Sequence, residues 1–220
     1  MRIELSCAGE GNLEAVRLGI VQAENVGWDE EPCADIDRAL DAFLADPRAA
    51  PSASRKAAVR DMLRYGSYKP AGRAKPSSEY LLAAALGGEF PRVNFPVDAA
   101  NIESLRSGYP ISIVDIGKAG REFHLRRGKA GEAYVFNSGG QEIDLEDLLI
   151  VCRKEGEIFV PTANPVRDSM ATKIFSQPVS VAAFIYAPAG PEGEELESVC
   201  ARLGEWLASK GNAVSWSVWR

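Results

Sequence analysis

The chain has 220 residues, of which 46% are hydrophobic and 25% charged, enough for one large domain or two small ones with a proper core. Its formal net charge of −6 at pH 7 argues against a protein that coats nucleic acid indiscriminately, but leaves room for a local basic patch. No apolar run is long enough to span a membrane, and the amino terminus lacks a signal-peptide pattern, so neither membrane insertion nor export is expected.

The cysteine and histidine content bears on metal binding and location. Cys7, Cys33, Cys152 and Cys200 are far apart and form no C-x-x-C pair, and His124 is the only histidine. A zinc site of cysteines and histidines cannot be assembled from this set. We therefore expect no metal, no other cofactor, and reduced thiols in a cytoplasmic protein.

The first part of the chain predicts a strand followed by helices. Residues 16–26 are rich in strand-type residues. Residues 34–46 carry apolar residues at helical spacing and predict an amphipathic helix. Residues 54–66 predict a second helix with its basic side chains outward and Gly66 as its stop.

Residues 76–88, PSSEYLLAAALGG, predict a third helix. Its expected cap is Ser77 or Ser78, because a serine hydroxyl accepts hydrogen bonds from free N–H groups at a helix start. Gly87 is its expected end.

The pattern changes from helix to strand after residue 108. Residues 96–108 predict a short helix ended by Gly108, with Asp98 near its start. Glycine-punctuated apolar segments then predict strands, at residues 109–116, 122–128, 133–137, 147–153, 157–163 and 179–187. Residues 193–211 predict a last amphipathic helix, and residues 213–219 alternate as a closing strand. These elements predict an α+β fold with a layered, β-rich, sandwich-like core flanked by helices.

Basic residues are concentrated between residues 55 and 75. They are Arg55, Lys56, Arg60, Arg64, Lys69, Arg73 and Lys75. A local cluster of this kind is consistent with RNA binding through phosphates, although solvated helix faces and loops are the commoner explanation. The RNA contacts that we expect are Arg60, Arg64, Lys69, Arg73 and Lys75.

Short polar side chains stand beside apolar, core-like segments in two stretches. The stretch from Arg92 to Asp115 contains Asn94, Asp98 and Asn101, and residues 162–175, TANPVRDSMATKIF, contain Asn164, Asp168, Ser169 and Thr172. Buried polar groups must be hydrogen-bonded, so each cluster is either a structural network or a site. For Asp168 and Ser169 the structural alternative is a capped turn. We interpret the two stretches as parts of one pocket.

The segment NFPVDAANIESLRSGYPISIVDIGKAG, residues 94–120, resembles the signature of the B3/B4 domain of the bacterial phenylalanyl-tRNA synthetase beta subunit. That signature runs N-x-x-V-D-x-x-N, then G-x-P, then a stretch ending in Asp. The matching residues are Asn94, Val97, Asp98, Asn101, Gly108, Pro110 and Asp115, followed by Arg127, Gly131 and Glu132 in the next strand pair. Residues 164–188 resemble the last segment of the family, so the resemblance spans roughly residues 77–188.

The resemblance implies a free-standing B3/B4 protein with a single domain over residues 1–220. Residues 77–188 are its matched core, residues 1–76 an N-terminal strand and helical extension, and residues 189–220 a C-terminal helix and strand. No counterpart of the aminoacylation or anticodon-binding domains is present, so a complete phenylalanine–tRNA ligase is not expected.

The function that the resemblance implies is a trans-acting editing hydrolase that deacylates mischarged aminoacyl-tRNA. Its partner would be the aminoacylated 3′ end of tRNA. Two alternatives remain open: a non-catalytic tRNA- or RNA-binding module, and a sensor that binds a free amino acid.

An editing site must place a water, anchor the α-ammonium and donate hydrogen bonds to the developing oxyanion. By resemblance, Asp168 stands where the family has a glutamate and is expected to anchor the amino group or orient water. Ser112 stands where the synthetases usually have a histidine, and together with Ser169 it completes the expected catalytic set. The expected substrate-binding residues are Asn94, Asp98, Asn101, Asn164 and Thr172. For the first three of these, a buried structural network remains the alternative.

Overall fold

A computed structural model of the chain describes residues 2–9, 11–29, 33–46 and 48–219. Within these ranges the protein is an α+β protein with six helices and three sheets, of four, four and two strands. The helices are α1 (Ala34–Ala45), α2 (Ala53–Leu63), α3 (Ser77–Leu86), α4 (Phe95–Ser107), α5 (Ile116–Ala119) and α6 (Leu196–Ala208). None of the helices in the described ranges has the length and apolar character needed to cross a bilayer.

The strands form two larger sheets and one hairpin. The strands are β1 (Glu4–Cys7), β2 (Val16–Val26), β3 (Ile111–Asp115), β4 (Glu122–Arg127), β5 (Ala133–Val135), β6 (Glu142–Asp144), β7 (Leu149–Glu155), β8 (Ile158–Ala163), β9 (Val179–Pro188) and β10 (Asn212–Trp219). The first sheet has the order β1-β4-β7-β8, with β1 parallel to β4. The second has the order β10-β2-β9-β3 and is antiparallel throughout, and β5 pairs with β6.

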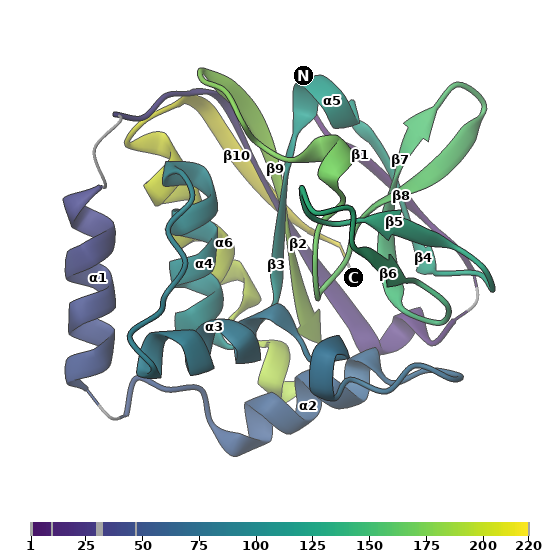
Figure 1. The fold of residues 1–220 in the computed structure, drawn as a ribbon, viewed down its shortest axis with the longest axis horizontal. Coiled ribbons are helices and arrows are strands. Elements are labelled where there is room, and N and C mark those ends of the chain that lie inside the picture. Colours follow the sequence, from purple (N-terminus) through teal and green to yellow (C-terminus); the bar gives the residue numbers. More distant parts are fainter. Residues whose placement is uncertain (1, 10, 30–32, 47, 220) are drawn as a thin grey trace.

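The second sheet is the central layer of the molecule. In Figure 1 it lies between α4 and α6 on one side and the first sheet on the other. Gly19 of β2 lets α6 approach closely, because a Cβ there would lie 2.5 Å from Cys200 Sγ. On the opposite face, Phe184 of β9 meets Phe123 of β4 edge to face, with ring centroids 5.0 Å apart. Both faces of β2 and β9 are therefore covered, which explains why nearly every residue of both strands is buried.

The buried guanidinium of Arg127 joins the first sheet to α2. Arg127 is 8% exposed and donates to the carbonyl oxygens of Gly11 at 2.9 Å, Met62 at 3.0 Å and Leu63 at 3.1 Å. Burial lowers the pKa of this group to about 10. Because two of these acceptors are last-turn carbonyls of α2, Arg127 satisfies groups that a helix end leaves unpaired.

The longer predicted elements are confirmed, and two predicted helix boundaries are wrong. Helix α2 ends at Leu63, where Arg127 takes the free carbonyls, and Gly66 lies instead in a tight turn with φ of 48°. Helix α3 begins at Ser77 itself, so Pro76 holds the cap position and no serine side chain caps the helix. Strands β1 and β6 were not predicted, since both are only three or four residues long.

Candidate functional site

A pocket of about 590 Å³ lies between helices α3 and α4, the hairpin β5–β6 and the segment that leads into β9. We call it the Asp168 pocket. Its apolar wall is formed by Val93, Val97, Ile113, Val166, Met170 and Ile174, its aromatic residues are Tyr80, Phe136 and Phe175, and its polar and charged residues include Arg73, Lys75, Ser77, Asn137, Ser138, Arg167, Asp168 and Lys173. Asp168 is the one carboxylate among the lining residues that the structure describes.

Asp168 presents an incompletely hydrogen-bonded carboxylate to this pocket. Its Oδ2 accepts a hydrogen bond from the Ile113 N–H at 3.1 Å. Its Oδ1 is buried and has no hydrogen-bond partner among the described residues. Burial raises the pKa of Asp168 to about 6, although the nearby Ser112 hydroxyl, the Ile113 N–H and the charge of Lys173 each act in the opposite direction. At neutral pH the site therefore holds a desolvated negative charge that a cationic donor would stabilise.

Ser77 carries the second unsatisfied group in the same pocket. Its Oγ is buried without a partner, and in the described part of the chain only this atom and Asp168 Oδ1 share that property. Both residues line the Asp168 pocket. Folded proteins rarely leave buried polar atoms unpaired, so the wall of this pocket is where the described part of the chain lacks hydrogen-bond partners.

The expected hydroxyl groups lie behind the pocket wall. The Ser112 side chain is fully buried and donates to the Asn164 carbonyl oxygen at 3.0 Å. The Ser112 oxygen also lies 3.1 Å from the Tyr186 hydroxyl. A hydroxyl has one proton, so Tyr186 donates in that second bond. The structure thus brings Ser112 beside Asp168, but not to the surface of the pocket.

Ser169, Thr172 and Asn164 also make internal hydrogen bonds. The Ser169 hydroxyl accepts from the N–H of Ala171 at 3.2 Å and so begins the 3-10 turn η3 (Met170–Thr172). The hydroxyls of Thr172 and Thr162 are 2.9 Å apart. The Asn164 side chain accepts from two backbone N–H groups in its own turn. These bonds fix the loop that carries Asp168, and none of the three side chains lines the pocket.

Asn94 and Asp98 organise the start of α4. Asn94 caps the helix by accepting from the Val97 N–H at 3.2 Å, and its amide donates to the Ile174 carbonyl at 3.1 Å. Asp98 accepts from the Val93 N–H at 2.8 Å, and burial raises its pKa. Val93, Val97 and Ile174 all line the Asp168 pocket, so this network shapes its wall from behind.

Asn101 stands apart from the site. It lies in the second turn of α4 and is partly buried. In the described part of the chain it makes no hydrogen bond through its side chain, and it does not line the Asp168 pocket.

The basic residues of α2 are neutralised within the protein. Arg60 makes two hydrogen bonds to the Glu79 carboxylate, at 2.5 and 2.6 Å. Arg64 pairs with Asp61 at 2.7 Å. These two predicted RNA contacts therefore already have anionic partners.

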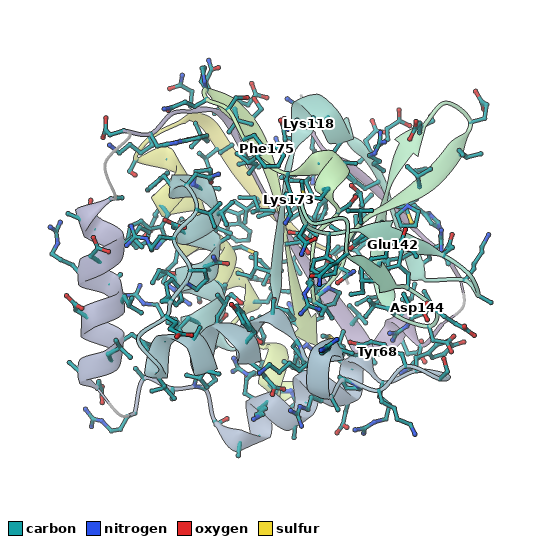
Figure 2. All side chains as sticks on the ribbon, in the orientation of Figure 1. Tyr68, Lys118, Glu142, Asp144, Lys173 and Phe175 are labelled. Carbon is teal, nitrogen blue, oxygen red and sulfur yellow. The ribbon has the colours of Figure 1, made fainter. Side chains whose placement is uncertain are left out.

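The later half of the basic cluster is different. Arg73 and Lys75 line the Asp168 pocket and make no ion pair within the described ranges. Lys69 lines a neighbouring hollow together with Glu142 and Asp144. Figure 2 shows these two carboxylates apart from Lys173 of the Asp168 pocket. Of the predicted RNA contacts, only Arg73 and Lys75 lie at the pocket that contains Asp168.

Several lining residues were not foreseen, namely Ser77 as a pocket residue, Tyr80, Phe136, Arg167, Lys173 and Phe175. Ser77 and Tyr80 belong to a segment that the sequence marks only as the start of a helix. Lys173 and Phe175 close the polar stretch 162–175, and their position beside Asp168 is the one signal that could have identified them.

Metal binding has no candidate in the described part of the chain, where no group of three His, Cys, Asp or Glu side chains could hold an ion. His124 lies in the first sheet, with its Nδ1 2.8 Å from the Ser6 hydroxyl, and it does not line the Asp168 pocket. Comparison of the chain with known protein families and with curated proteins finds no match. The chemistry of the site is therefore argued from its residues.

Proposed function

We propose that this chain is a trans-acting editing hydrolase that deacylates mischarged aminoacyl-tRNA, with a layered fold of the B3/B4 type. The observation that carries the proposal is the Asp168 carboxylate, whose Oδ1 is buried without a partner, in a pocket of about 590 Å³ with an apolar wall. The sequence resemblance over residues 77–188 supports the same assignment, because Asn94 and Asp98 of that motif hold the pocket wall.

An aminoacyl ester complements the features of the pocket. Its α-ammonium pairs with the Asp168 carboxylate, and an ion pair in a desolvated site is stronger than one in water. Its side chain packs on the apolar wall formed by residues such as Val97 and Ile174. The hydroxyl of Ser77 provides a further hydrogen bond to the bound group.

The reaction in this proposal is hydrolysis of the ester by water. Water adds to the carbonyl carbon, the bond from that carbon to the ribose oxygen breaks, and a proton passes to the departing ribose oxygen. The products are a free amino acid and RNA with a free terminal hydroxyl. Asp168 binds and orients the substrate, so the rate gain comes from positioning the ester toward water. A neighbouring hydroxyl of the terminal ribose assists the proton transfer.

The test is a screen of the purified protein against a full set of aminoacyl-tRNAs, following loss of the ester. We expect at least one of them to be hydrolysed faster than its spontaneous rate, and Asp168→Asn to lower that rate roughly 100-fold, the loss typical of a removed charged contact of about 3 kcal/mol. Asp61→Asn removes an exposed carboxylate on α2 and is the matched control. Spontaneous rates for every aminoacyl-tRNA would refute catalysis.

A second candidate is an amino-acid-binding module without catalysis. The observation that favours it is that the hydroxyls of Ser112, Ser169 and Thr172 are all engaged in internal hydrogen bonds. It predicts stabilisation of the wild-type protein by an amino acid amide, loss of that stabilisation in Asp168→Asn, and no ester hydrolysis.

A further inference from the structure

The mouth of the Asp168 pocket combines exposed aromatic rings with unpaired cations. Tyr80 is 54% exposed and Phe175 is 66% exposed, and both line the pocket. They are two of the three large aromatic side chains exposed in the described part of the chain, the third being Trp216. Exposed rings gathered at one site indicate an interaction surface rather than the scattered apolar residues of an ordinary surface.

The charge at this mouth is opposite to that of the whole chain. Arg73, Lys75, Arg167 and Lys173 line the pocket, and none of them makes an ion pair in the ranges that the structure describes. By contrast, Arg60 on α2 is held by Glu79. A chain with a net charge of −6 therefore keeps a group of free cations at one place.

The cations are held next to the rings. Lys118, which is paired with Asp115 at 3.4 Å and lies outside the pocket lining, places its Nζ 4.9 Å from the centroid of the Phe175 ring and donates to the Lys173 carbonyl at 2.5 Å. Figure 2 shows these three residues as one group beside α5. On the other side of the pocket, the Arg167 guanidinium lies 4.7 Å from the Phe136 ring and donates to the Arg73 carbonyl at 3.0 Å. Aromatic rings and positively charged side chains thus lie next to one another around the mouth of the pocket.

We infer that this mouth binds the single-stranded 3′ end of an RNA, with bases stacked on Tyr80 and Phe175 and phosphates on the surrounding cations. Aromatic platforms beside positive charge are the physical requirements for single-stranded nucleic acid, because every base has a face that can stack and every nucleotide carries a phosphate. A paired helix offers no free base faces to such a site. The inference rests on the proposed function for the identity of the RNA.

The test uses two fluorescent RNA hairpins of equal length, one with a four-nucleotide single-stranded 3′ end and one with that end paired. Binding is measured by anisotropy at several salt concentrations. We expect the wild-type protein to favour the single-stranded end, and Tyr80→Ala and Phe175→Ala each to weaken that binding roughly 10-fold. Tyr80→Phe keeps the ring and is expected to keep the affinity.

Two controls separate stacking from charge and from folding. Trp216→Ala removes an exposed aromatic from β10, at the opposite edge of the sheet from β3, and is expected to leave binding unchanged. Arg73→Gln and Lys75→Gln are expected to reduce the salt dependence of binding by about 0.7 in log–log slope each, while the ring variants leave that slope unchanged.

The outcomes distinguish this inference from the proposed hydrolase. Preference for the single-stranded end that is lost in the two ring variants, without ester hydrolysis, supports the inference and refutes catalysis. Equal binding of the two hairpins, or full affinity in the double variant Tyr80→Ala/Phe175→Ala, overturns the inference. Hydrolysis of an aminoacyl-tRNA at the wild-type rate by that double variant also overturns it, while the hydrolase stands.

Discussion

Replacing Asp168 with asparagine tests the electrostatic description of the pocket without any substrate. The variant keeps the size of the side chain and an oxygen for the Ile113 N–H, but it removes the buried charge. Burial raises the pKa of Asp168 from 3.8 to about 6, so the folded protein holds this proton more tightly than the unfolded chain does. Wild-type stability therefore gains from Asp168 at low pH, and that gain is lost as the pH rises through about 6.

The magnitude follows from the size of the shift. A difference of roughly two pKa units corresponds to about 3 kcal/mol at roughly 1.4 kcal/mol per unit. About 2 kcal/mol of this change falls between about pH 4.5 and pH 7.5. The free energy of unfolding of the wild type, relative to Asp168→Asn, is therefore expected to fall by that amount across the interval.

Urea denaturation of both proteins at half-unit pH steps measures this difference directly, because the other titrating groups are common to both. Asp61→Asn, at an exposed position, is expected to stay within about 0.5 kcal/mol of the wild type. A difference between wild type and Asp168→Asn that is flat with pH, or that grows as the pH rises, would refute the description of Asp168 as a desolvated carboxylate with a raised pKa.

Two further variants test the packing that holds the site. Arg127→Met leaves two buried carbonyl oxygens and one partly buried carbonyl oxygen without their donor, and it is expected to lower the free energy of unfolding by about 3 kcal/mol or more. Arg64→Met, at the surface, serves as its control, and equal losses of the two variants in chemical denaturation would contradict the role of Arg127. Gly128→Ala places a Cβ 1.8 Å from the Leu145 carbonyl oxygen and is expected to cost about 2 kcal/mol, whereas Gly139→Ala meets only an ordinary contact at 3.5 Å. An unchanged melting temperature for Gly128→Ala would show that the backbone between β6 and β7 shifts to accommodate the added methyl group without loss of stability.

The long helices and strands were predictable because the order of apolar and polar residues in their sequences is typical of a helix or of a strand. Strand β2 is rich in strand-type residues, and α6 has apolar residues at helical spacing with Leu196, Leu203 and Leu207 buried. The short strands β1 and β6 have too few residues to show a period, and they exist only because β4 and β5 offer them an edge. The boundary at Gly66 was missed for a similar reason, since Arg127 is distant in sequence from the helix that it ends.

The site was predictable only to the level of the segments that form it. Asp168 lines the pocket, as the polar stretch 162–175 indicates, but Ser112 does not. Successive residues of a strand point to opposite faces, so Ile113 faces the pocket and its neighbour Ser112 is directed into the interior. Which face of β3 meets the hollow depends on tertiary packing. The same holds for Arg60, whose charge is cancelled by Glu79 of a different helix.

The position of β2 has a consequence for synthesis of the protein on the ribosome. This strand leaves the exit tunnel among the first segments, yet both of its neighbours, β9 and β10, are among the last to be translated. Closing such distant pairs costs loop entropy before any contact compensates. Until β9 and β10 have been translated, both edges of β2 are unpaired and open to non-native strand pairing, and a product truncated before Asn212 lacks an edge strand of its central layer.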